Sequence, residues 1–192
     1  WCDDTREAAL IDPGGDIGEL LEAVESRGLT LKALWLTHAH IDHAGGTGTL
    51  ARTLALPIIG PHPGDQFWID ALPQQSQMFG FPQAEGFAPT RWLDQGETVQ
   101  IGHSTLNVLH CPGHTPGHVV FYSAELKHAF VGDVLFAGSI GRTDFPLGNH
   151  ADLINAIKTR LLPLGDDVTF TPGHGPESTL GEERRFNPYL RG

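Results

Sequence analysis

Histidine and aspartate occur in four short segments of the chain, each at the end of an apolar run. The run LKALWL leads into THAHIDHAGG at 37–46, and VLHCPGHTPGH occupies 108–118. Further on, AFVGDVLF places Asp133 at the end of an apolar strand, and VTFTPGHGP presents His174. A carboxylate in such a place is costly unless it is paired. Because loops at strand ends carry chemistry, we expect the four segments to converge at one edge of the sheets.

The first of these segments has the spacing of a metal-binding loop. Its three histidines, His38, His40 and His43, share six positions with Asp42, and a short loop leaving a buried strand can turn all four toward one point. The glycines at 45–46 let the backbone turn tightly into the next helix. Imidazole and carboxylate together suit zinc, iron or manganese rather than calcium. The alternative is a set of surface histidines in a polar loop.

Composition narrows the classes of partner. The chain has 192 residues and a net charge of −11, which disfavours nucleic acid as a partner. No apolar run is long enough to span a bilayer, so we expect no membrane partner, and the sequence leaves the oligomeric state open. The two cysteines form no disulfide framework, which favours a reducing, cytoplasmic compartment. The opening residues have the pattern of a hairpin already under way, so we expect a further strand before Trp1.

The order of apolar patterns predicts a mixed α/β sandwich in a single domain over 1–192. The first half alternates strand, helix, strand, helix and strand, and 61–92 looks like an insertion lying over the fold. From Leu93 the pattern turns to antiparallel strands. The expected strands cover 8–15, 31–37, 57–60, 98–113, 118–133 and 167–175. The expected helices cover 16–28, 48–57, 149–165 and 178–186. We expect the last of these helices to have an N-cap at Ser178 or Thr179.

The order of the motifs HxHxDH, PGHT, GD and PGHG resembles the metallo-β-lactamase superfamily. The stretch GRTDFPLG at 141–148, with the chain length, is similar to the glyoxalase II (hydroxyacylglutathione hydrolase) branch and to its short bacterial YcbL-type members. The resemblance covers essentially the whole chain. It implies an α+β fold, the four-layer αββα sandwich.

The resemblance also implies two divalent metal ions, with zinc first and iron or manganese as alternatives. One ion would be held by His38, His40 and His114, the other by Asp42, His43 and His174, and Asp133 would bridge them. All of these positions are filled by the residues that the family pattern requires. Asp42 and Asp133 are the predicted catalytic residues.

Two metal ions can share a hydroxide, which supplies a nucleophile at neutral pH. The resemblance implies a binuclear thioester hydrolase, and this chemistry explains why the sequence shows ligands but no nucleophilic Ser or Cys with a partnered base. The resemblance implies S-lactoylglutathione or a similar small thioester as the substrate. It also implies Arg142 as the substrate-binding residue, with pairing to Asp144 in its own loop as the equal alternative. Full-length glyoxalase II enzymes carry a C-terminal helical domain whose basic residues grip glutathione. Only 18 residues follow His174 here, so we expect no such domain and weak glutathione binding, with Arg142, the insertion, or Arg184 and Arg185 standing in.

The main rival is a persulfide dioxygenase, a related enzyme with one iron. Its ligands here would be His38, His114 and Asp133. Retention of every ligand of the second ion favours the hydrolase. Lactonase or β-lactamase activity and a metal-binding scaffold without turnover are weaker alternatives.

Several other residues that could be considered as metal ligands fit structural roles better than direct ligation. We expect His110 and His118 to orient a neighbouring ligand, and Cys111 to be a small packed residue. The aromatic residues of the insertion either anchor it or line a substrate cleft, and anchoring is favoured. The remaining histidines, expected at the surface or in local hydrogen bonds, are His62, His103, His128 and His150.

Overall fold

The computed structural model describes residues 1–191 and divides into two compact units. The first unit comprises 1–93 and 99–105, and the second comprises 94–98 and the chain from 106 onward. The division runs through the hairpin of β4 (Thr98–Ile101) and β5 (Ser104–His110). Both units combine a sheet with helices, so each is described below by itself.

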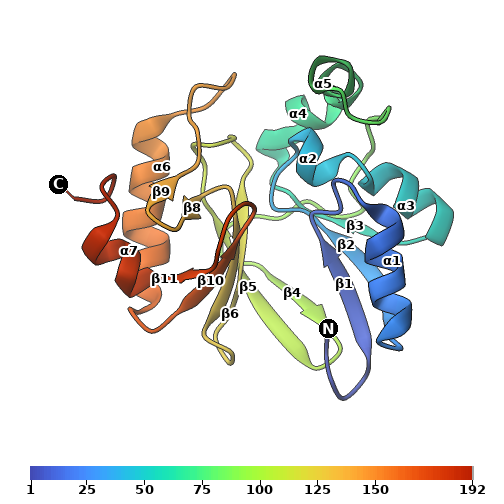
Figure 1. The fold of residues 1–192 in the computed structure, drawn as a ribbon, viewed down its shortest axis with the longest axis horizontal. Helices are drawn as coiled ribbons and strands as arrows, with labels where there is room; N and C mark the ends of the chain where they lie inside the picture. The colour runs from blue at the N-terminus through green and yellow to red at the C-terminus, as the bar shows by residue number, and fades with distance from the viewer. Residues whose placement is uncertain (192) are drawn as a thin grey trace. The chain divides into compact units, whose positions relative to one another are not determined.

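The first unit contains a parallel sheet in the order β1-β2-β3, formed by β1 (Glu7–Ile11), β2 (Thr30–Trp35) and β3 (Ile58–Ile59). The crossovers contain α1 (Ile17–Ser26) and α3 (Thr47–Leu54), which lie on the same side of this sheet (Figure 1). This is the strand and helix alternation that the sequence predicts. Residues 33–35 at the end of β2 are buried.

The segment expected as an insertion is largely helical. A 3₁₀ turn (Pro63–Asp65) leads into α4 (Gln66–Asp70) and α5 (Leu72–Phe79). Trp68, Ile69 and Leu72 are buried, while Phe67 and Phe79 are about half exposed. The buried side chains support the interpretation that this segment is anchored by apolar packing.

The second unit is built on strands β11-β10-β7-β6-β5 of a sheet whose last strand, β4, lies at the division. Beyond the β4–β5 hairpin it contains β6 (Val119–Ser123), β7 (His128–Gly132), β10 (Thr169–Pro172) and β11 (Ser178–Thr179). Strands β5, β6 and β7 pair antiparallel, and β10 pairs parallel with β7. Parallel pairing puts the carboxyl ends of β7 and β10 at the same edge, which is where Asp133 and His174 follow.

Two helices cover one face of this sheet, α6 (His150–Ala156) and α7 (Leu180–Phe186) (Figure 1). Helix α6 continues as a π-helical turn (Ile157–Leu161) and a 3₁₀ turn (Leu162–Leu164), so the predicted helix is present with an irregular end. Its buried residues belong to the apolar core of the unit, with Leu153, Ile157 and Leu161 fully buried. Each contributes about 1.5–3 kcal/mol by burial.

The sequence did not predict the short hairpin of β8 (Leu135–Phe136) and β9 (Ser139–Ile140). Two residues per strand are too few to give a readable alternation. By contrast, the predicted start of α7 is confirmed, since the Thr179 side chain accepts a hydrogen bond from the backbone N–H of Glu182.

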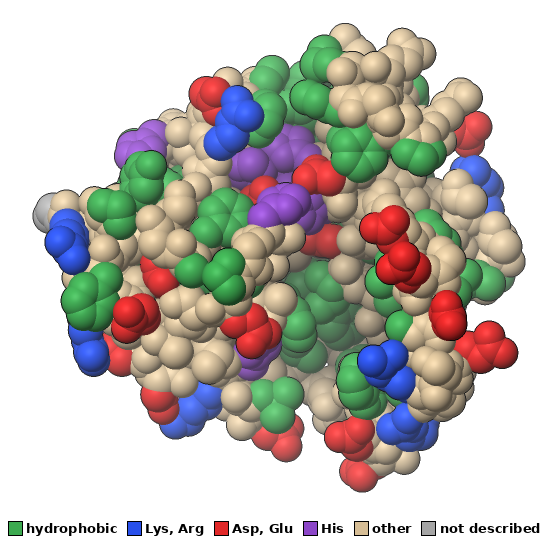
Figure 2. All heavy atoms as spheres, in the orientation of Figure 1, with side chains coloured by type: hydrophobic (Ala, Val, Ile, Leu, Met, Phe, Trp, Pro, Cys, Tyr) green, Lys and Arg blue, Asp and Glu red, His purple; other side chains and the backbone are tan. Residues whose placement is uncertain are grey.

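The surface of the first unit reflects the acidic composition. Acidic side chains gather over α1 (Figure 2), where Asp16, Glu19, Glu22 and Glu25 are exposed. Among residues 1–191, no helix combines the length and the apolar character that crossing a membrane requires.

Candidate metal centre

The histidine segment of the first unit is buried rather than solvent-exposed. It begins where β2 ends and runs into α2 (Ile41–Ala44), a single helical turn that carries Asp42 and His43. The exposed fractions of His38, His40 and His43 are 0%, 7% and 3%. Imidazoles are not placed in an interior for packing alone, so the interpretation of this loop as a set of surface histidines is wrong.

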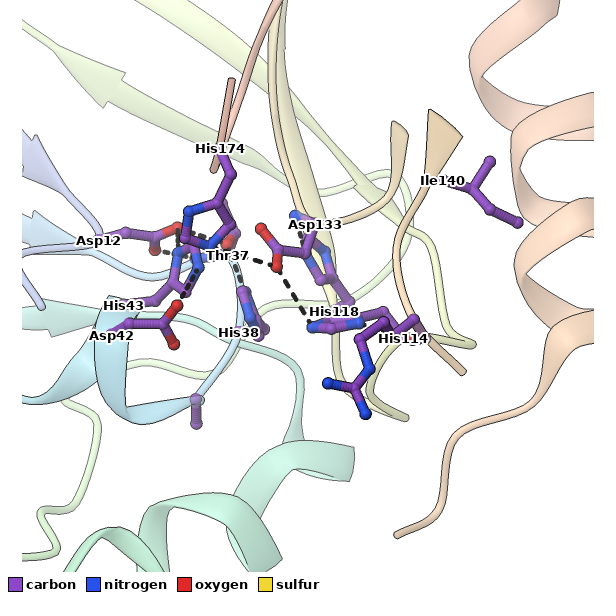
Figure 3. Close-up of polar contacts among 12 residues, drawn as sticks. Asp12, Thr37, His38, Asp42, His43, His114, His118, Asp133, Ile140 and His174 are labelled. Carbon is purple, nitrogen blue, oxygen red and sulfur yellow. Dashed lines mark hydrogen bonds and ion pairs between the residues drawn. The ribbon is translucent and has the colours of Figure 1, made fainter. Parts of the chain in front are cut away.

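Asp12 is a member of this cluster that sequence reasoning missed. It directly follows β1, and its carboxylate accepts hydrogen bonds from Thr37 N–H at 2.7 Å and from Thr37 Oγ1 at 2.6 Å. Its Oδ2 atom also lies 3.0 Å from Nδ1 of His43 (Figure 3). Asp12, His38 and His43 each offer a ligand atom within 4.8 Å of the others. The sequence did contain a signal for Asp12. Like Asp133, it stands at the end of an apolar strand, and Pro-Gly follows it.

The Asp12 contact determines which nitrogen His43 presents. A carboxylate at Nδ1 holds the proton there and leaves the lone pair on Nε2. This Nε2 atom lies 3.6 Å from Oδ2 of Asp42. The two predicted ligands therefore face each other with their lone pairs, which is the arrangement that a cation stabilises.

Buried polar side chains of the predicted insertion, 61–92, hold the backbone of the same loop. The carboxylate of Asp65 accepts a hydrogen bond from Ala39 N–H at 3.0 Å, and Gln75 Oε1 accepts one from Ile41 N–H at 3.0 Å. Asp65 is fully buried and Gln75 is 5% exposed. The segment therefore fixes the loop that carries the histidines. Its aromatic residues gave no indication of this role.

Gly14 allows a close approach of two backbones at the loop. A Cβ atom on Gly14 would lie 1.7 Å from the carbonyl oxygen of Asp42, which no real contact allows. At the neighbouring Gly15 nothing lies within 4 Å of a Cβ atom. The turn after β1 therefore packs directly on α2, and only glycine fits at the first of the two positions.

The second unit places Asp133 between two histidines. Asp133 directly follows β7, and its Oδ2 atom is 3.6 Å from Nε2 of His114 and 3.6 Å from Nε2 of His174 (Figure 3). The backbone N–H of Asp133 donates to Nε2 of His118 at 3.0 Å. The predicted ligands of this unit thus come together, and His118 has the orienting role expected of it.

The orientation of His114 is set by a backbone carbonyl. Its Nδ1 atom lies 2.7 Å from the carbonyl oxygen of Arg142, so this nitrogen carries the proton and Nε2 has the lone pair that faces Asp133. A Cβ atom on Gly141 would lie 1.9 Å from the carbonyl oxygen of Asp133 and 3.2 Å from Nδ1 of His114. Glycine at position 141 therefore lets this segment reach His114.

The distances within each unit fit metal ligands better than hydrogen bonds. The three separations of 3.6 Å, Asp42–His43, His114–Asp133 and His174–Asp133, are too long for hydrogen bonds. Two donors at about 2.1 Å from one tetrahedral ion would be roughly 3.4 Å apart. The donor set of imidazole and carboxylate suits zinc, iron or manganese. The first unit supplies His38, His40, Asp42 and His43 to the predicted set, and the second supplies His114, Asp133 and His174.

Arg142 pairs with Asp144 in its own loop, which is the alternative to a role in substrate binding. Its guanidinium donates two hydrogen bonds to Asp144, at 2.9 and 2.8 Å, and stacks 4.4 Å from the centre of the Phe145 ring. The hydrogen bond from Arg142 lowers the pKa of Asp144 below its ordinary value. Since the Arg142 side chain is 66% exposed, contact with a substrate remains a prediction.

Three other histidines, His62, His110 and His128, make local hydrogen bonds. Nε2 of His110 lies 2.8 Å from the carbonyl oxygen of Pro116, and His128 contacts Thr169 and Thr171 at 2.7 and 2.9 Å. His62 accepts from Gly64 N–H at 3.0 Å. Cys111 is fully buried, and burial raises the pKa of its thiol to about 12, as expected for a packed and unreactive residue.

The comparison with known families decides the membership of the chain. The model of the metallo-β-lactamase superfamily matches residues 2–174. The chain belongs to this superfamily. The predicted α+β class, with two sheets and flanking helices, is confirmed as the metallo-β-lactamase fold.

Individual known proteins are similar to this chain over nearly its full length. The hydroxyacylglutathione hydrolase GloC of Haemophilus influenzae is 47% identical over 189 residues, which are 98% of this chain and 89% of GloC. The crystal structure of the B3 metallo-β-lactamase BLEG-1 is 38% identical with a TM-score of 0.91, and the match covers 100% of this chain and 92% of that one. The structure of TTHA1623 in a di-iron-bound form is 40% identical with a TM-score of 0.86, and the match covers 94% and 88% of the two chains.

Proposed function

We propose that the chain is a metal-dependent thioester hydrolase of the glyoxalase II type, with S-lactoylglutathione or a similar small thioester as its substrate. The observation that carries the proposal is the 47% identity to a hydroxyacylglutathione hydrolase over 98% of the chain. The cluster of Asp12, His38 and His43 in the first unit and the contacts of Asp133 with His114 and His174 in the second support it, because they provide the ligand types that such an enzyme needs.

The proposed ligand set follows the motif pattern of the superfamily. One divalent ion would be held by His38, His40 and His114, a second by Asp42, His43 and His174, and Asp133 would bridge them. When bound, the two ions would lower the pKa of a water nucleophile and polarise the carbonyl of the substrate. Zinc is the first choice, and the di-iron form of TTHA1623 makes iron a specific alternative.

The chain's own contribution is to orient ligands and hold protons at defined atoms. Asp12 keeps the proton on Nδ1 of His43, and the carbonyl of Arg142 keeps it on Nδ1 of His114. Both rings therefore present Nε2 without the reorganisation that a mobile imidazole would need. Because a thiolate is a good leaving group, the reaction requires no strong general acid.

Substrate binding is assigned to Arg142 within this proposal. Its guanidinium is exposed, and an exposed ion pair such as that with Asp144 contributes only about 0–1 kcal/mol, so a carboxylate of glutathione can displace Asp144. The free, buried cysteines are consistent with a reducing cytoplasmic location, which we include in the proposal.

The test combines metal content with turnover. We expect about two ions per chain after purification without added metal, and hydrolysis of S-lactoylglutathione. Asp133→Asn removes one charge from the proposed bridge and should lower both the metal content and kcat, by at least a hundredfold for kcat. His150→Gln, at an exposed histidine at the start of α6, is the matched control and should change neither.

The outcomes separate the proposal from its rivals. One iron per chain with oxygen uptake in the presence of a persulfide would replace the hydrolase with a dioxygenase. A second candidate is β-lactam hydrolysis, which is favoured by the similarity to BLEG-1. Turnover of a β-lactam that exceeds turnover of S-lactoylglutathione would establish it instead.

A further inference from the structure

A buried glutamate in the last helix has no part in the proposed ligand set. Glu183 lies in α7 and is 3% exposed. Glutamate is rarely buried without partners, and the three donors that reach it are neutral amide and hydroxyl groups. Oε2 accepts from Gly138 N–H at 2.8 Å and from Asn187 Nδ2 at 2.8 Å, and Oε1 accepts from Ser178 Oγ at 2.6 Å.

These bonds reach the turn of the β8–β9 hairpin. Asn187, fully buried, also donates from Nδ2 to the carbonyl of Ser139 at 2.9 Å. Glu183 therefore binds the N–H of Gly138, and Asn187 binds the carbonyl of the next residue in the same turn, Ser139. The hairpin itself pairs only Leu135 with Ile140 and Phe136 with Ser139. A ladder this short is marginal on its own, so its geometry depends on α7.

The hairpin connects two parts of the candidate centre. It begins at Leu135, two residues after Asp133, and ends at Ile140 (Figure 3). Gly141 follows, and its N–H points back to the carbonyl of Val134 at 3.4 Å. The next carbonyl, that of Arg142, lies 2.7 Å from Nδ1 of His114. A shift of the hairpin would thus move the carbonyl that orients His114.

We propose that Glu183 is a positioning residue for the candidate metal ligands of the second unit, and for His114 above all. Through Gly138 and Asn187 it fixes the β8–β9 hairpin, and the hairpin sets the carbonyl of Arg142 against the ring of His114. The effect on metal binding rests on the proposed function, whereas the effect on the hairpin does not. The same carboxylate binds Ser178, so it also holds the segment that follows His174.

The test compares three substitutions in one helix. Glu183→Ala removes all three hydrogen bonds. Glu183→Gln can retain them, because its carbonyl oxygen accepts from Gly138 and Asn187 and its amide donates to Ser178 Oγ. Glu182→Ala changes the exposed neighbour and is the matched control.

Two readouts are measured on protein freed of metal. Amide hydrogen exchange of 136–142 should be at least about tenfold faster in Glu183→Ala than in the control, with Glu183→Gln close to the wild type. The zinc dissociation constant, from competition with a chelator, should rise about tenfold in Glu183→Ala and recover in Glu183→Gln. A change in melting temperature alone would show a purely structural role and overturn the proposal.

The remaining outcomes are equally decisive. Unchanged exchange of 136–142 in folded Glu183→Ala, or unchanged zinc affinity, contradicts the proposal. If Glu183→Ala does not fold, Asn187→Ala, which removes the bond to Ser139, decides it by the same two readouts. If the wild type neither binds zinc nor hydrolyses thioesters, the proposed function fails, and the exchange data still report whether Glu183 holds the hairpin.

Discussion

The Oδ2 atom of Asp12 lies 3.0 Å from the Nδ1 atom of His43, across 31 positions of the sequence. The same carboxylate binds the backbone and the hydroxyl of Thr37, which directly precedes His38. One residue after β1 therefore sets both the beginning of the histidine loop and the tautomer of its last histidine.

Asp12→Asn should weaken metal binding. The amide NH₂ must face either the N–H of Thr37 or the donors at Oδ2, so one hydrogen bond is replaced by a repulsive contact. We expect the zinc dissociation constant to rise by about ten- to a hundredfold. Asp16→Asn is the matched control, because both aspartates have a left-handed backbone, with φ of 52° and 50°. Equal zinc affinities for the two variants would exclude this role of Asp12.

Gly14→Ala should destabilise the fold where Gly15→Ala does not. The new Cβ atom at position 14 would overlap the carbonyl of Asp42, whereas position 15 is open. We expect a loss of about 2–4 kcal/mol in the free energy of unfolding for the first variant and a change within about 1 kcal/mol for the second. Urea denaturation of both proteins measures the difference. Similar values would mean that the turn after β1 does not pack on α2.

Arg142→Ala should raise KM for S-lactoylglutathione about tenfold and change kcat by less than about threefold, since a charged hydrogen bond contributes about 1.5–3 kcal/mol. Arg52→Ala is the matched control, because Arg52 is an exposed arginine paired with Glu85 at 3.1 Å. Asp144→Asn should lower KM by weakening the competing ion pair. If KM is unchanged in Arg142→Ala, Arg142 does not belong to the substrate site.

Alkaline pH should destabilise the protein through Cys111. Burial raises the pKa of its thiol from the ordinary 9.0 to about 12, so between these values the unfolded chain loses a proton that the folded chain keeps. Stability therefore falls as pH rises above 9, by up to about 1.4 kcal/mol per pH unit from this group. Urea denaturation at pH 8.5, 9.5 and 10.5 should show a smaller decline for Cys111→Ala than for Cys2→Ala. Parallel declines would show that the thiol of Cys111 ionises within the folded protein.

Residues at strand ends were the part of the centre that could be predicted. His38, His114, Asp133 and His174 follow strands where the sequence placed them, because an apolar run and the polar segment after it are both local patterns. Asp12 has the same context and was not recognised. The single-domain organisation and the assignment of each ligand to a particular ion remain predictions.

Other features had no local signal. The burial of Glu183 could not be predicted, because its hydrogen-bond donors come from residues 138, 178 and 187. On an isolated α7 helix this glutamate would be exposed to solvent like the other glutamates. The loop-supporting contacts of Asp65 and Gln75 with residues 39 and 41 were equally hidden. A side chain's burial is decided by what packs on it, which the residue's own sequence neighbourhood does not contain.

By itself the sequence determined the order of strands and helices and the chemical types of the candidate ligands, since periodicity, turn residues and donor atoms are local properties. Tertiary structure decided which nitrogen of each imidazole carries the proton. His43 receives its partner from Asp12 and His114 from Arg142, 31 and 28 positions away. A hydrogen bond of this kind exists only after the chain has folded and brought the two groups within reach.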